Sequence, residues 1–135
     1  MIVLDTSAII DLARGGKETV EAIEAAEKKG RSIATTSVSI FELFTPVFHK
    51  NMQKKEKMLK TLIQNMTMLP LSQDAAEESA RIMGALLKIG RPVNVLDALI
   101  AGIAQSNNAE EVLSRDADYK EIAKISNLKI HFIEK

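Results

Sequence analysis

The chain has 135 residues with 18 basic and 18 acidic side chains, so we expect one domain, residues 1–135, without net charge. Zero net charge leaves only local basic patches to attract nucleic acid, and the absence of cysteine excludes disulfides, thiolate metal sites and cysteine nucleophiles. The apolar start already reaches an acid at Asp5, and no stretch approaches the roughly 20 apolar residues of a membrane span, which predicts a soluble, cytoplasmic protein without a signal peptide.

Short apolar runs alternate with helical periodicity along the whole chain. The first run, Ile2 to Leu4, is unbroken, as is typical of a strand buried on both faces of a parallel sheet. In chain order we predict strands over residues 2–4, 32–36, 68–71, 111–114 and 129–133, separated by helices over residues 6–12, 18–29, 38–48, 58–66, 72–89, 95–105 and 116–124. Such alternation predicts a three-layer α/β/α sandwich around a mostly parallel sheet of about five strands.

Asp5 stands where the first predicted strand passes into a helix. In an open parallel sheet, ligands bind at the carboxyl ends of the strands, so this position suits a functional carboxylate. Aspartate is also a favoured helix N-cap, and Asp5 taken alone is compatible with both interpretations. The other acids of the chain decide between them.

Three further acids interrupt apolar sequence. Glu42 and Asp97 lie inside apolar helical segments, and Asp116 follows the fourth predicted strand. Each also has a local explanation. Ser39 and Glu42 have the spacing of a capping box, while Asn94 could cap the helix that carries Asp97, and Asp116 could be a cap itself. No basic residue is placed to neutralise Glu42 or Asp97, and burying an unpaired carboxylate is costly.

The acids share one kind of position, because all of them fall near strand-to-helix turns or in first helical turns, which gather at one edge of a parallel sheet. Carboxylates gathered there repel one another, and a divalent cation relieves the repulsion. Oxygen ligands without cysteine or nearby histidine suit Mg²⁺ or Mn²⁺ rather than Zn²⁺, and such ions commonly serve phosphoryl chemistry. The sequence therefore favours one shared metal site over independent caps.

Four segments carry these acids, in the order I-V-L-D-T-S-A-I-I-D-L, T-S-V-S-I-F-E-L, N-V-L-D-A-L-I-A and S-R-D-A-D-Y. The ordered set resembles the PIN-domain ribonucleases, specifically the VapC-type toxins of prokaryotic toxin–antitoxin pairs, and the resemblance spans essentially the whole chain. It implies an acidic metal site formed by Asp5, Glu42, Asp97 and Asp116. It also implies hydroxyls that order this site, from Thr6, Ser7 and Ser114. The family often has threonine where Ser114 stands, and serine keeps the hydroxyl.

The activity implied by the resemblance is metal-dependent hydrolysis of RNA phosphodiester bonds. Asp5 and Asp97 would hold the principal Mg²⁺ or Mn²⁺, with Glu42 and Asp116 as further direct or water-mediated ligands. The ion would polarise a phosphoryl oxygen and lower the pKa of a bound water for in-line attack. For Asp118 a surface position is favoured over a role as an extra acid.

The basic stretch from Lys50 to Lys60 either follows the RNA backbone or forms the solvated face of a helix. Lys50 and Lys54 would contact RNA in the first case, and Arg91, just before the helix of Asp97, is a further candidate phosphate contact. Asp11 is assigned to the surface of the first helix or to holding a loop.

The third predicted helix carries apolar residues on more than one stripe, among them Phe41, Phe44 and Phe48. Either all of them enter the core, or one face meets a partner. The resemblance implies two protein partners, a second copy in a homodimer and a cognate antitoxin that lays an apolar segment in a groove and blocks the site.

Two other Mg²⁺-dependent α/β classes are excluded by position. A phosphoacceptor receiver domain needs an aspartate at the end of its third strand, which Met68–Leu71 lacks. A haloacid-dehalogenase-like phosphatase needs a second acid two residues after Asp5, where Ser7 stands. Two alternatives stay open: a non-toxin RNA-processing PIN nuclease, and a catalytically silent RNA- or protein-binding module of the same fold.

Overall fold

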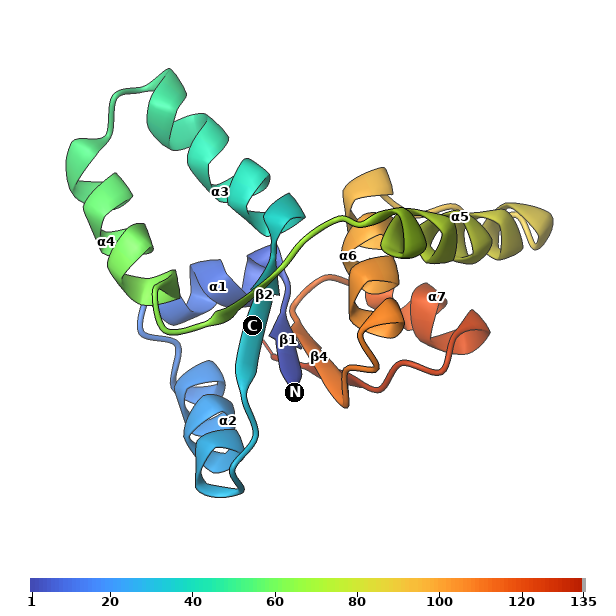
Figure 1. Cartoon of the computed structure of the whole chain (residues 1–135), viewed down its shortest axis with the longest axis horizontal. Helices are drawn as coiled ribbons and strands as arrows, with labels where there is room; N and C mark the ends of the chain where they lie inside the picture. The colour runs from blue at the N-terminus through green and yellow to red at the C-terminus, as the bar shows by residue number, and fades with distance from the viewer. Residues whose placement is uncertain (135) are drawn as a thin grey trace.

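A five-stranded sheet with helices on both faces forms the molecule, as seen in the computed structural model, which describes residues 1–134 (Figure 1). Its strands are β1 (Ile2–Leu4), β2 (Ile33–Thr36), β3 (Thr67–Leu69), β4 (Glu111–Ser114) and β5 (Ile130–Phe132). They lie in the order β3-β2-β1-β4-β5, and every neighbouring pair is parallel. The predicted α/β/α fold is confirmed. Lys135, the last residue of the predicted domain, lies outside the described residues.

The helices between the strands are α1 (Thr6–Ala13), α2 (Lys17–Lys28), α3 (Ser37–His49), α4 (Gln53–Ile63), α5 (Gln73–Lys88), α6 (Val95–Ser106) and α7 (Asp118–Ile125). Most begin and end close to the predicted residues. The exception is α4, which begins at Gln53, inside the basic stretch, rather than at Met58, because lysine, glutamate and glutamine are good helix formers even where no apolar periodicity marks them. Within the described residues, no helix has the length and apolar character needed to cross a membrane.

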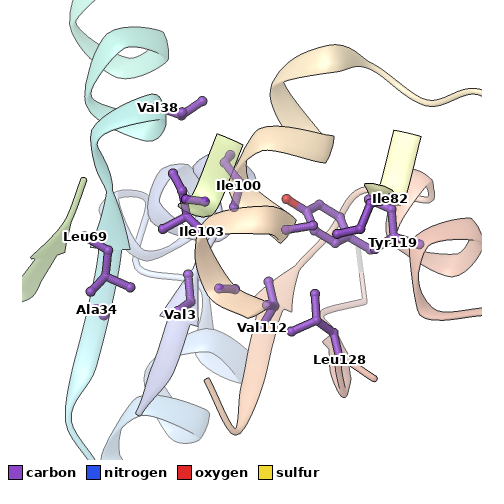
Figure 2. Close-up of a cluster of buried hydrophobic side chains, with 14 of the residues drawn as sticks. Val3, Ala34, Val38, Leu69, Ile82, Ile100, Ile103, Val112, Tyr119 and Leu128 are labelled. Carbon is purple, nitrogen blue, oxygen red and sulfur yellow. The ribbon is translucent and has the colours of Figure 1, made fainter. Parts of the chain in front are cut away.

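Two hydrophobic cores lie on opposite faces of the sheet, because successive residues of a strand point to opposite sides. On one face Val3 and Val112 pack beneath residues of α5, α6 and α7, including Ile100 of α6 (Figure 2). On the other face Ile2 and Leu113 pack against residues of α1 to α4. Strands β1 and β4 are covered on both sides, which explains why apolar residues stand next to one another in each, as Val112 and Leu113 do in β4.

Helices α3 and α4 pack on each other and project from the sheet as an arm (Figure 1). Leu43 and Val47 of α3 are buried, but Phe41 is 63% exposed and Phe48 is 60% exposed. The apolar residues of this helix therefore do not all enter the core, and the interpretation that core packing alone explains them is wrong.

The strand order decides where the site lies. Strand β1 is central, with β2 on one side and β4 on the other. All three end at the same edge because they are parallel. The residues directly after them, Asp5, Ser37 and Arg115, begin the segments that carry Asp5, Glu42 and Asp116, whereas Asp97 lies in α6, which precedes β4.

Candidate metal centre

Asp5 occupies the carboxyl end of β1 and is 1% exposed. Its Oδ1 accepts a hydrogen bond from the Ala8 amide at 2.8 Å, so it caps α1 as predicted. The hydroxyl of Ser7 donates to the same oxygen at 2.8 Å, and that of Ser114 donates to Oδ2 at 2.5 Å. The interpretation of Asp5 as a helix cap is therefore correct but incomplete, because this buried carboxylate also accepts two hydroxyl hydrogen bonds that a helix cap does not need.

A tight group of three carboxylates lies beside Asp5. Asp97 is in the first turn of α6, and Asp116 and Asp118 flank the start of α7. One carboxylate oxygen of each lies within 4.8 Å of the others. Asp118 Oδ2 also accepts from the Asn94 amide at 3.0 Å, which ties the start of α7 to the start of α6. The surface position expected for Asp118 is wrong: it is half-buried and part of the group.

These carboxyls perturb one another. Burial, a hydrogen bond with Asp118 and the charges of neighbouring carboxylates together raise the pKa of Asp97 to about 9. Burial raises the pKa of Asp5 to about 6, although its hydrogen bonds act in the opposite direction. Burial raises the pKa of the Tyr119 hydroxyl, and the negative charges of Asp5, Asp97, Asp116 and Glu42 raise it further. The four acids singled out in the sequence therefore all lie near enough to Tyr119 to act on its pKa.

Glu42 reaches this edge from α3 and is bound to α1 rather than to its own helix. The Thr6 hydroxyl donates to Glu42 Oε1 at 2.7 Å. The N-cap of α3 is Thr36, whose hydroxyl accepts from the Ser39 amide at 3.1 Å. The capping box that the spacing of Ser39 and Glu42 allowed therefore does not form: Thr36 caps α3, and Glu42 accepts from Thr6 instead. Glu42 lies beside the three-carboxylate group and not within it.

The hydroxyls expected from the resemblance do contact the acids. Besides its bond to Asp5, Ser114 Oγ accepts from the Asp116 amide at 2.9 Å. Ser7 Oγ likewise accepts from the Arg115 amide at 2.9 Å. Each hydroxyl therefore accepts a hydrogen bond from an amide of the β4–α7 loop and donates one to Asp5. Together they hold the loop of Asp116 against the end of β1.

The donor set fits a hard divalent cation. The group consists of carboxylate oxygens alone, and hard oxygen ligands of this kind suit Mg²⁺ and Mn²⁺. Burial first, and the neighbouring carboxylates second, raise the pKa values of Asp97 and Asp5, so both side chains resist ionising. A bound cation would remove that resistance by compensating the negative charge.

A family model described as the PIN domain matches residues 2–125. The chain belongs to the PIN-domain family. The matched range includes every acid and hydroxyl described above. No curated protein sequence matches the chain.

Solved structures of toxin–antitoxin complexes are similar to this PIN domain. One is VapBC2 from Rickettsia felis bound to a promoter DNA fragment, with a TM-score of 0.86 and 21% identity, covering 99% of this chain and 100% of that one. Another is DNA-bound VapBC from Salmonella typhimurium, with a TM-score of 0.81, 21% identity and coverage of 97% and 96%. A third is VapBC-5 from Mycobacterium tuberculosis, with a TM-score of 0.73, 26% identity and 97% coverage of both chains.

An ion pair that the sequence did not reveal fixes the β4–α7 loop of the PIN domain. Arg115 Nη1 donates to Asp11 Oδ1 at 2.8 Å, and the Thr19 hydroxyl donates to Asp11 Oδ2 at 2.5 Å. A Cβ at Gly16 would collide with this carboxylate, so the turn between α1 and α2 closes directly over it. Of the two positions predicted for Asp11, holding a loop is the correct one.

Two basic residues that line clefts beside the acids are Arg14, which the sequence did not single out, and Lys55, which belongs to the predicted basic stretch. Lys50 follows the last residue of α3, a helix of 13 residues, and is therefore about 20 Å along the axis from its start. Lys54 lies at the same tip of the arm, and Arg91 is exposed in the loop before α6. Arg14 lines both the cleft that contains Asp116 and the cleft that contains Glu42, and Lys55 lines the second of these. Arg14 is at the C-cap of α1, a position that only the packing of α1 on its neighbours brings to the site.

Proposed function

We propose that the chain is a metal-dependent ribonuclease of the VapC type, the toxin of a toxin–antitoxin pair, with Mg²⁺ or Mn²⁺ as its cofactor. The observation that carries this proposal is the convergence of Asp97, Asp116 and Asp118, each with an oxygen within 4.8 Å of the others, beside the buried Asp5. Uncompensated carboxylates at such distances are unfavourable, so their convergence supports a bound cation. A catalytically silent module would not need it.

Roles for the residues follow from their contacts. Asp5, Asp97 and Asp116 would bind the ion, with Asp118 as an additional carboxylate and Glu42 as a more distant or water-mediated ligand. Ser7 and Ser114 orient the Asp5 carboxylate, and Thr6 orients Glu42.

When bound, the ion supplies charge compensation for the phosphoryl group and a water molecule of lowered pKa. The protein residues contribute position: hydrogen bonds hold Asp5 and the Asp116 loop in one arrangement before substrate arrives. Catalytic groups held in this way gain rate because no reorganisation is needed during the reaction.

Two protein partners belong to the proposal. The structural neighbours are VapBC complexes, which supports a cognate antitoxin for this chain. A groove of about 200 Å³ beside Glu42, between α1, α3 and α4, suits an apolar antitoxin segment because Leu43, Pro46 and Met58 are among its lining residues. The exposed Phe41 and Phe48 support a homodimer.

The test is RNA cleavage by the purified full chain with Mg²⁺ or Mn²⁺, compared with Asp5→Asn and Asp97→Asn. We expect both variants to lose at least about 100-fold in rate and to keep the wild-type circular dichroism spectrum. The matched control is Asp74→Asn, an exposed acid in the first turn of α5, which should cleave as the wild type does. Undiminished cleavage by both site variants would overturn the nuclease assignment.

The toxin role is separated from RNA processing by growth. Expression of the active chain should arrest growth, and co-expression of the protein from the adjacent small gene should restore it. Growth that is unaffected by an RNA-cleaving chain would favour a processing nuclease with the same site.

A further inference from the structure

Two clefts open beside the acids, and Arg14 lines both. The larger, of about 640 Å³, is formed by Ser7, Ile10, Arg14, Arg115, Asp116 and Ala117. The smaller, of about 200 Å³, contains Arg14 together with Glu42 of α3 and Lys55 of α4. Arg14 therefore stands between Asp116 on one side of the acidic site and Glu42 on the other.

The charge of Arg14 is not used by the folded protein. Arg115, in the same cleft, is paired with Asp11 at 2.8 Å, whereas Arg14 forms no ion pair within residues 1–134. Its side chain is exposed, so its guanidinium is available to a ligand in the cleft.

The chemistry of the position indicates the ligand. A guanidinium presents a planar fork of donors that matches two phosphate oxygens. A cleft that borders a metal-binding acidic site would be entered by a phosphodiester strand, whose next phosphates lie within one or two nucleotides of the one at the metal. Lys55 lines the smaller cleft together with Arg14 and also forms no ion pair within residues 1–134.

We propose that Arg14 binds a backbone phosphate of the RNA strand next to the phosphate held at the acidic site, and that Lys55 binds the same strand further along. This inference rests on the proposed ribonuclease function and assigns the substrate path across it. The strand would run from the cleft of Asp116 past Arg14 into the groove between α3 and α4. The antitoxin segment proposed for that groove would compete with RNA for the same two cations.

The experiment compares cleavage kinetics of the wild type, Arg14→Gln, Arg14→Lys and the control Lys29→Gln in Mn²⁺. Lys29 is an exposed cation that follows α2, outside both clefts. On an RNA that extends several nucleotides on both sides of the cut, Arg14→Gln should raise KM about 5- to 10-fold with little change in kcat, because the lost contact binds ground state and transition state equally. Arg14→Lys should recover part of the loss, and Lys29→Gln should match the wild type.

Two further readouts separate a phosphate contact from a structural role. The slope of log(1/KM) against log[salt] should become shallower by about 0.7 in Arg14→Gln, the value for one single-strand phosphate contact. The KM defect should also shrink when the RNA is shortened to a dinucleotide, which has no neighbouring phosphate. An unchanged salt slope, a defect of equal size on the dinucleotide, or an effect confined to antitoxin affinity would overturn the inference. Absence of any cleavage by the wild type would overturn the ribonuclease proposal with it, whereas an active wild type with an unaffected Arg14→Gln overturns this inference alone.

Discussion

Asp97 carries the largest electrostatic cost in the acidic site. Its pKa is raised from 3.8 to about 9 by burial, by a hydrogen bond with Asp118 and by the charges around it. The folded state therefore binds this proton more tightly than the unfolded state does. Without metal, the contribution of Asp97 to the free energy of unfolding is most favourable below pH 3.8 and is lost as pH rises toward about 9.

We expect Asp97→Asn to reverse this penalty in the metal-free protein, because an amide cannot ionise. In the presence of a chelator, the Tm of Asp97→Asn should exceed that of the wild type at about pH 8, and the two should converge near pH 4. Saturating Mn²⁺ should raise the Tm of the wild type only, since the ion binds the ionised carboxylate. A Tm difference that is constant across this pH range would contradict the assignment of the shift to Asp97.

Ser114 shows how one buried hydroxyl serves two acids, because it donates to Asp5 at 2.5 Å and accepts from the Asp116 amide at 2.9 Å. Ser114→Ala should lower the free energy of unfolding by about 1–3 kcal/mol, as one buried donor loses its partner. It should also reduce cleavage by about 10- to 100-fold, the usual effect of losing a residue that orients metal ligands. Ser114→Thr keeps the hydroxyl and should recover most of the activity. Urea denaturation and cleavage rates test this, with Ser106→Ala, whose hydroxyl contacts only the backbone of its own helix, as the control.

At the scale of elements, the position of Asp97 depends on how closely α6 packs on α5. A Cβ at Gly102 of α6 would lie 2.6 Å from the Ser79 amide nitrogen and 2.7 Å from the Ala75 carbonyl oxygen, both in α5. These are backbone atoms of a helix, which cannot move aside separately. The glycine therefore sets the distance between the two helices.

Gly102→Ala should consequently lower the free energy of unfolding by about 1–3 kcal/mol, because α5 must shift to accept the methyl group. The matched control is Gly84→Ala in α5, where an added Cβ meets nothing within 4 Å. That substitution should be neutral or stabilise the protein by up to about 1 kcal/mol, as alanine is the better helix former. Chemical denaturation distinguishes the two; equal effects would show that helix propensity, not the close approach, governs both.

The helices also show which local rules the packing overrides. The spacing of Ser39 and Glu42 suits a capping box, yet Thr36 caps α3 and Glu42 turns to Thr6 of α1. A helix N-cap contributes about 1 kcal/mol to the free energy of unfolding, and Thr36 already supplies this contribution for α3. The carboxylate is then held by a hydrogen bond between two helices that only the folded chain brings together.

At the scale of the whole molecule, the arm formed by α3 and α4 presents an apolar surface. Phe41 is 63% exposed and Phe48 is 60% exposed, and aromatic side chains of this kind gain most from burial at an interface. We expect the protein to sediment as a dimer and the double variant Phe41→Glu/Phe48→Glu to sediment as a monomer with a native circular dichroism spectrum. Leu87→Glu on α5, at a residue that is also 60% exposed, should leave the dimer intact. Dissociation by Leu87→Glu alone would place the interface on α5 instead.

The sequence by itself determined the fold class and predicted the acids of the site. Alternating strand and helix patterns predict a parallel sheet, and in a parallel sheet the segments that follow the strands must meet at one edge. Asp5, Glu42, Asp97 and Asp116 are recognisable because each is a charge in apolar sequence near such a segment. That argument needs topology only, so it holds without side-chain coordinates.

Only the tertiary structure decided which other side chains join them. Asp118 looked like a surface residue, but the loop before α6 turns it toward Asp97. Arg14 and the pair of Asp11 with Arg115 carry no sequence signal, since their positions follow from the length of α1 and from the way the β4–α7 loop packs on it. Local patterns report on a residue's own segment. The Asp11–Arg115 pair joins residues 104 positions apart, and Asp118 meets Asn94 across 24 positions. The packing of helices on the sheet sets the geometry of both contacts.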